Sequence, residues 1–124
     1  MKSRLIIFVA IALMFAGCKK KPGPGGKNII SGTVYFMNGI SGTKEVATDA
    51  QVSIAYGSNQ STTEFDKTIL TKEDGTYDFE GLRKGDYYLT ATFTDAHGFV
   101  YKTNGAVVEF KHAKKEARVE LILE

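Results

Sequence analysis

The sequence holds one cysteine, Cys18, and its neighbours limit what its sulfur can do. A run of 12 apolar residues, Leu5 to Ala16, precedes it, and the basic residues Lys2 and Arg4 come before that run. A membrane-spanning helix needs about 20 apolar residues, so a shorter run after a basic segment is typical of a secretory signal peptide. A lone cysteine also excludes a disulfide within the chain. The folded part must therefore be held together by its hydrophobic core.

Other side chains that could do chemistry are few and scattered. The chain has two histidines, and one of them, His97, shares a turn with Asp95. Glu73 and Asp74 share another turn. Two ligands are too few for a zinc or calcium site, and no serine stands in a recognisable motif with a base. The sequence therefore predicts no catalytic residue, no metal site and no cofactor.

Charge divides the chain into a basic stalk and a mildly acidic body. The formal net charge is +2, from 16 basic and 14 acidic side chains. Residues 28 to 124 hold 10 of the basic and all 14 of the acidic side chains, a net of −4. A nucleic-acid partner would need a basic patch on the folded domain, so none is predicted.

Residues 18 to 28 are predicted to form a flexible tether. The stretch "CKKKPGPGGKN" is rich in Pro, Gly and Lys and has no large apolar residue to bury. Its three consecutive lysines are either a solvated spacer or a segment attracted to anionic lipid headgroups. The remaining residues, 29 to 124, are predicted to form one domain.

That domain is predicted to be an all-β sandwich of seven or eight antiparallel strands. Apolar and polar residues alternate with a period of two, which is typical of strands with one buried face. Turn signals such as Asn38-Gly39 and Asn104-Gly105 separate these segments. The expected strands are 29–36, 49–56, 63–70, 75–82, 86–95, 98–103, 105–112 and 116–124. The expected core is Ile30, Val34, Val52, Ile54, Tyr77, Phe79, Leu82, Tyr87, Leu89, Phe93, Val119 and Leu121.

The stretch "FAGC", Phe15 to Cys18, resembles a bacterial lipobox, with Phe15 in the place of the usual Leu. The resemblance implies a signal peptide of residues 1 to 17, cleavage after Gly17, and a diacylglycerol thioether on Cys18 with a further acyl chain on its amine. Two or more acyl chains hold a protein stably on a membrane. No acidic residue follows Cys18 directly, which favours an outer-membrane lipoprotein that faces the periplasm.

The stretch from Thr71 to Phe93, "TKEDGTYDFEGLRKGDYYLTATF", resembles the carboxypeptidase regulatory-like, transthyretin-like family of Greek-key sandwiches. The matching positions are Thr71, Gly75, Tyr77, Phe79, Leu82, Gly85, Tyr87 and Leu89, whereas Lys72 stands where the family often has Asp. The resemblance implies a non-catalytic domain. A hydrolase branch of this fold remains a remote alternative, because the chain ends in "ELILE" and lacks the Tyr-Arg-Gly-Ser terminus of that branch.

Strand alternation places two tyrosines, Tyr35 and Tyr88, on outer faces of the sandwich. An exposed Tyr suits contact with a protein or a sugar, and it also suits cross-strand pairing that only stabilises a sheet. We therefore expect either a lipid-anchored module that binds or scaffolds a protein or glycan partner, or a structural spacer without a ligand. The domain is expected to be a monomer. If the tyrosines do not bind, the loops Gly57 to Thr62 and Asp95 to Gly98 are the next candidates.

Overall fold

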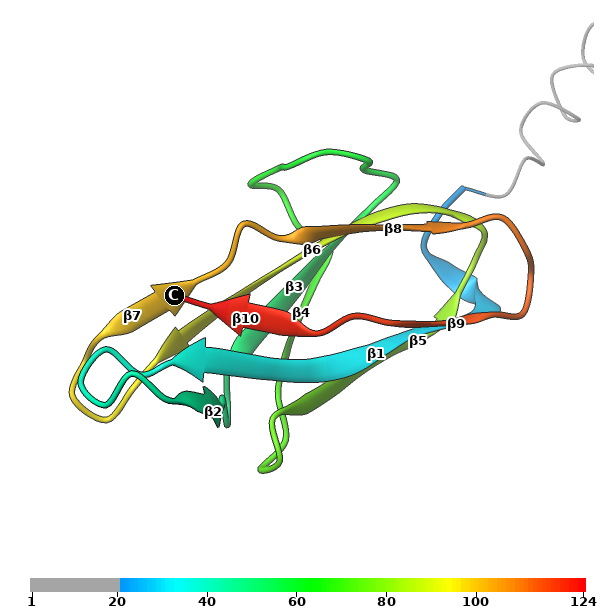
Figure 1. The fold of residues 1–124 in the computed structure, drawn as a ribbon. Coiled ribbons are helices and arrows are strands. Elements are labelled where there is room, and N and C mark those ends of the chain that lie inside the picture. The colour runs from blue at the N-terminus through cyan, green and yellow to red at the C-terminus, as the bar shows by residue number, and fades with distance from the viewer. Residues whose placement is uncertain (1–20) are drawn as a thin grey trace, which may run out of the picture.

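The computed structural model describes residues 21 to 124, which form two five-stranded sheets packed face to face (Figure 1). The prediction of an all-β sandwich is confirmed, with ten strands in place of seven or eight. The first sheet contains β1 (Pro24–Met37), β2 (Lys44–Val46), β5 (Thr76–Leu82), β9 (Glu116–Arg118) and β10 (Leu121–Leu123). The second contains β3 (Gln51–Tyr56), β4 (Lys67–Leu70), β6 (Gly85–Thr94), β7 (Val100–Lys102) and β8 (Ala106–Phe110).

The long strand β1 is the centre of the first sheet. It pairs antiparallel with β5 and then with β2, and parallel with β9 and then with β10. All pairs of the second sheet are antiparallel, with β6 joined to β3, β7 and β8. The first sheet is therefore mixed, which the sequence pattern did not predict.

The segment 116–124 forms two strands instead of the single strand expected from its alternation. The break falls at Val119 and Glu120, where the chain passes very close to Gly32 of β1. A Cβ atom on Gly32 would lie 1.7 Å from the Val119 carbonyl oxygen, so only glycine fits. The Glu120 carboxylate accepts a hydrogen bond from Thr33 N at 2.9 Å, where the ladder is interrupted. A side chain thus satisfies the backbone at the break.

The core lies between the two sheets. Ten of the twelve residues predicted for it are buried, whereas Phe93 and Val119 are partly buried and pack against its edge. Phe93 contacts the buried ring of Phe36, with ring centroids 4.6 Å apart. The inward-facing residues of both sheets therefore form one continuous apolar layer.

Residues 22 to 28 are bound to the sandwich, so the predicted flexible tether is wrong for this segment, which we call the strap. From Pro24 onward the strap is the first part of β1, and Asn28 is completely buried. Its Oδ1 accepts a hydrogen bond from Lys115 N at 2.7 Å. Pro22 packs on Gly85, since a Cβ there would lie 2.3 Å from the Pro22 Cγ. Period-two alternation could not reveal this attachment, because these residues carry few side chains that alternate.

The hydroxyl of Tyr87 fastens the strap to the turn between β5 and β6. It accepts a hydrogen bond from Gly23 N at 2.9 Å and donates one to the Arg83 carbonyl oxygen at 2.7 Å. Arg83 N in turn donates to the Gly23 carbonyl oxygen at 2.8 Å. Burial raises the pKa of Tyr87 above its usual value, so the phenol stays neutral and keeps both roles.

We predict that Tyr87→Phe lowers the free energy of unfolding by about 1–3 kcal/mol, because it leaves the buried Gly23 N and the partly buried Arg83 carbonyl oxygen without their partner. Urea denaturation of the wild type and the variant measures this loss. Tyr35→Phe is the matched control, since no hydrogen bond joins the Tyr35 hydroxyl to another group within residues 21 to 124. Equal stability of the two variants would contradict the assigned role of Tyr87.

Candidate functional site

Tyr88 is buried, so the expectation that it is exposed is wrong. It lies on the outer side of β6 with only 6% of its surface accessible. Its hydroxyl donates a hydrogen bond to the Asn104 carbonyl oxygen at 2.9 Å. The ring of Phe65 stacks on it with a centroid separation of 6.4 Å and an interplanar angle of 17°. Strand alternation correctly assigned the side of the sheet but could not show that a loop returns to cover it.

Tyr35 is half-buried and lies on the other sheet, so the two tyrosines do not form one face. In the register of the first sheet it stands between Val46 of β2 and Ile122 of β10. The Lys44 ammonium lies 4.6 Å from the centre of its ring. These contacts match the alternative that Tyr35 pairs across strands.

The segment 57–66 connects β3 to β4 and covers part of the outer side of the second sheet. Figure 1 shows it as the long green loop above β3 and β6. Phe65 fixes one end of the segment on Tyr88, and the Asp66 carboxylate accepts a hydrogen bond from Tyr56 N at 2.6 Å. The sequence pattern left the facing of Phe65 open, because Phe65, Ile69 and Leu70 compete for the same apolar period.

An open hollow of about 400 Å³ lies against this segment. This volume falls in the range of sites that bind small ligands. Only Ser58 and Thr62 of the predicted alternative region Gly57 to Thr62 line the hollow, and its other lining residues come from the end of β3 and from the residues just before β4. Its lining consists of Ala55, Tyr56, Ser58, Thr62, Glu64, Phe65 and Asp66.

Several polar groups of the hollow are open to a ligand. Glu64 is exposed, and its carboxylate accepts no hydrogen bond from the rest of residues 21 to 124. Thr62 Oγ accepts a hydrogen bond from Glu64 N at 3.2 Å, which orders the loop beside it. Burial and the nearby charge of Asp66 raise the pKa of Tyr56, so its phenol remains a donor at neutral pH. Acceptors, a donor and aromatic rings therefore border one space.

A second surface, which we call the apolar tip, lies at the end of the sandwich opposite the strap. Ile40 in the β1–β2 loop is 71% exposed, and Phe99 and Val100 beside β7 are 53% and 55% exposed. They border a hollow of about 290 Å³ together with Gly39, Tyr101 and Glu124. Figure 1 shows the two loops that carry them side by side at the left. Clustered exposed apolar side chains often mark contact sites.

Hydrogen bonds to Asp95 and Tyr101 hold the apolar tip in place. The Tyr101 hydroxyl accepts from Gly39 N at 3.1 Å and donates to Asp95 Oδ2 at 3.3 Å. Asp95 Oδ1 accepts from His97 N and Phe99 N, both at 2.9 Å. Partial desolvation opposes ionisation, but these hydrogen bonds outweigh it and lower the pKa of Asp95 below its usual value. The charged carboxylate therefore stabilises the turn.

We predict that the amide chemical shifts of His97 and Phe99 titrate with a midpoint below about 3.9, the usual pKa of Asp. A lowered folded-state pKa means that the stabilisation is present above the unfolded-state pKa and is lost as the pH falls through the folded-state value. NMR between pH 7 and pH 2 measures the midpoint. The titration should vanish in Asp95→Asn and persist in Asp74→Asn, which changes a different turn. A midpoint at or above the usual value would contradict the prediction.

Cys18 lies outside the described residues, so the structure does not test its modification. Between residues 21 and 124 there is no helix that is long and apolar enough to cross a membrane. The same part of the chain brings no three His, Cys, Asp or Glu side chains together as metal ligands. His97 lies in the β6–β7 turn and His112 follows β8, near the opposite end of the sandwich.

Comparison by sequence finds neither a protein-family model nor a curated protein that matches the chain. Comparison of folds finds solved β-sandwich structures that are similar. One is described as a "putative carbohydrate binding protein" from Pseudomonas aeruginosa, with a TM-score of 0.58 and 16% identity over 86% of this chain and 93% of that one. Another is the major pilin subunit of Bacillus cereus, with a TM-score of 0.54 and 15% identity over 80% of this chain. The chain spans 30% of that pilin. At these identities the likeness shows the fold alone.

Proposed function

We propose that this protein is a non-catalytic glycan-binding module, anchored by a lipid in the bacterial cell envelope. The observation that carries the proposal is the open hollow of about 400 Å³ at the 57–66 segment. The description of the Pseudomonas aeruginosa protein as carbohydrate binding supports the same class of ligand. The resemblance of Thr71 to Phe93 to a mostly non-catalytic family supports binding without turnover.

The side chains of the hollow suit the hydroxyl-rich surface of a sugar. The carboxylates of Glu64 and Asp66 can accept hydrogen bonds from sugar hydroxyls, and the Tyr56 phenol can donate one. The lining of the hollow is mainly polar, so hydrogen bonds from these groups carry the proposed contact with a sugar. Polar loop groups on a sandwich scaffold are a common arrangement for binding sites.

We predict that a soluble chain from residue 18 with Cys18→Ser binds at least one neutral hexasaccharide from a panel of glucan, xylan, mannan and chitin oligomers. Isothermal titration calorimetry measures the affinity. Glu64→Gln should weaken binding about fivefold or more, because a charged acceptor makes a stronger hydrogen bond than a neutral one. Chromatography should recover the oligosaccharide intact after prolonged incubation.

Glu80→Gln is the matched control, because Glu80 is also exposed but lies on β5, outside the hollow. It should leave the affinity unchanged. Equal weakening by both variants, or no binding to any member of the panel, would overturn the glycan site. Cleavage of the oligosaccharide would overturn the non-catalytic assignment and favour the hydrolase alternative.

The anchor in this proposal is a lipid on Cys18, and the lipobox-like stretch Phe15 to Cys18 is the signal for its attachment. A thioether-linked diacylglycerol on Cys18 with a further acyl chain on its amine would hold the protein stably. In this proposal the protein faces the periplasm from the outer membrane, which the lack of an acidic residue directly after Cys18 favours. The module acts there as a monomer.

We predict that Cys18→Ser releases the protein from the membrane fraction or leaves an uncleaved precursor. Ser cannot form the thioether, so the lipid-dependent processing step would stop. Fractionation of cells and mass spectrometry of the N-terminus measure the outcome. A mature wild-type protein with an intact, unmodified Cys18 would contradict lipidation.

A second candidate function is contact with another envelope protein through the apolar tip. The exposed side chains of Ile40, Phe99 and Val100 favour it, because aliphatic surface suits a protein better than a sugar. If neither the hollow nor the apolar tip binds a partner, the structural spacer remains.

A further inference from the structure

Basic side chains gather at the end of the sandwich where the described chain begins. Three segments meet there: the strap with the residue before it, the β5–β6 turn, and the β8–β9 loop. Figure 1 shows the blue strap and the orange β8–β9 loop together at the right. Residues 21–28, 83–84 and 111–115 contain no acidic residue. Their seven basic residues are Lys21, Lys27, Arg83, Lys84, Lys111, Lys114 and Lys115.

The nearest carboxylates in the sequence do not neutralise this basic end. Glu80, Asp86, Glu109 and Glu116 flank it, which leaves a net of +3 from seven basic and four acidic groups. Glu109 pairs with Lys111 at 3.5 Å, and Glu116 accepts a hydrogen bond from Ser31. The rest of residues 21 to 124 has five basic and ten acidic groups, a net of −5. The folded domain therefore carries net positive charge at the strap end and net negative charge over its other residues.

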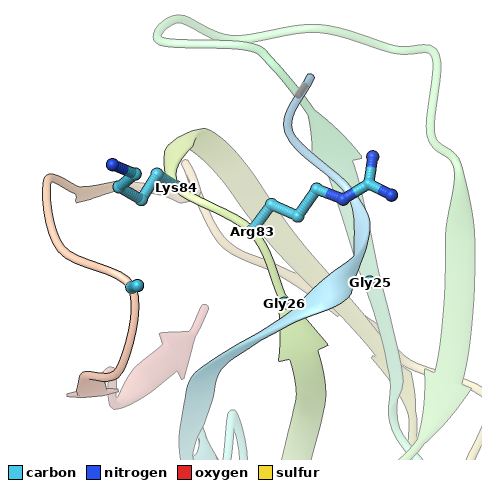
Figure 2. Close-up of a pocket in the computed structure, with 5 residues that line it drawn as sticks. Gly25, Gly26, Arg83 and Lys84 are labelled. Atoms are coloured by element: carbon cyan, nitrogen blue, oxygen red, sulfur yellow. The ribbon is translucent and has the colours of Figure 1, made fainter. Parts of the chain in front are cut away.

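The strap builds this end into a fixed surface. Gly25 and Gly26 of the strap border a hollow of about 130 Å³ with Arg83, Lys84 and Ala113. Figure 2 shows the Arg83 side chain passing beside Gly25, while Lys84 points away from the strap. The Arg83 Nε atom is buried and has no hydrogen-bond partner within residues 21 to 124. An anion that approaches this end therefore meets a buried, unpaired Arg83 Nε donor beside the exposed Lys84.

We propose that this basic end docks on the headgroups of anionic phospholipids. Because Pro22 already packs on the body, only four residue steps separate Cys18 from the sandwich, which is at most about 15 Å. Basic side chains within about 8 Å, the Debye length at physiological salt, are attracted to an anionic leaflet. The acidic remainder of the domain is repelled by the same surface. Docking thus gives the domain one orientation on the membrane.

The test uses the full-length protein incorporated in lipid nanodiscs, either of phosphatidylcholine alone or of an equal mixture with phosphatidylglycerol. Hydrogen–deuterium exchange is measured at residues 83–85 and 111–115. We expect exchange at these residues to be about fivefold slower, or more, in the anionic discs. One lysine near an anionic surface contributes about 1 kcal/mol of binding free energy, which corresponds to a factor of about five. The loop 95–99, at the other end, should exchange equally in both discs.

A fourfold variant, Lys84→Gln, Lys111→Gln, Lys114→Gln and Lys115→Gln, should lose this protection. Its matched control replaces four exposed lysines elsewhere, Lys44→Gln, Lys67→Gln, Lys72→Gln and Lys102→Gln, and should keep it. Equal exchange in both kinds of disc, or protection that survives in the first variant, would overturn the proposal. The proposal rests on the lipid anchor proposed at Cys18 and not on glycan binding, and mass spectrometry of the N-terminus tests that anchor separately from the exchange experiment.

Discussion

The hydroxyl of Tyr87 is the contact on which the arrangement of this protein depends. By bonding Gly23 N and the Arg83 carbonyl oxygen, it joins the start of the described chain to the β5–β6 turn. It acts together with the Arg83 N bond to the Gly23 carbonyl oxygen and the burial of Asn28, which hold residues 22 to 28 on the sandwich although their composition is that of a loose Pro/Gly linker. The strap is the first part of β1, and β1 pairs with the four other strands of the first sheet. One buried phenol thus connects the attachment of the chain to the order of its first sheet.

This attachment gives the two ends of the sandwich different properties. The strap end is basic and has glycines and lysines on its surface, whereas the opposite end exposes Ile40, Phe99 and Val100. The polar hollow at the 57–66 segment lies on the outer side of the second sheet, where it is held by the Phe65–Tyr88 stack. In the account proposed above, the basic end meets lipid, and the hollow and the apolar tip stay free for partners.

The fold could be predicted from the sequence because alternation and turn residues are local signals. Ile30, Val34, Leu89 and Leu121 are buried as their positions in the alternating pattern require. The errors concern contacts between segments far apart in the chain. Period-two patterns could not show that Phe65 covers Tyr88, or that Gly32 receives the Val119 carbonyl and divides the last strand. The candidate site moved from Tyr35 and Tyr88 to loop residues for the same reason, since loop placement depends on tertiary packing.

The central claim is that a fixed strap turns the basic end toward the membrane and leaves the opposite end free. Paramagnetic relaxation from a nitroxide-labelled headgroup lipid tests this orientation most directly, with the full-length protein in anionic nanodiscs. The account predicts strong broadening of the Ala113 amide signal in the β8–β9 loop and none at Gly98 in the β6–β7 turn. Equal broadening at both residues, or stronger broadening at Gly98, would contradict it.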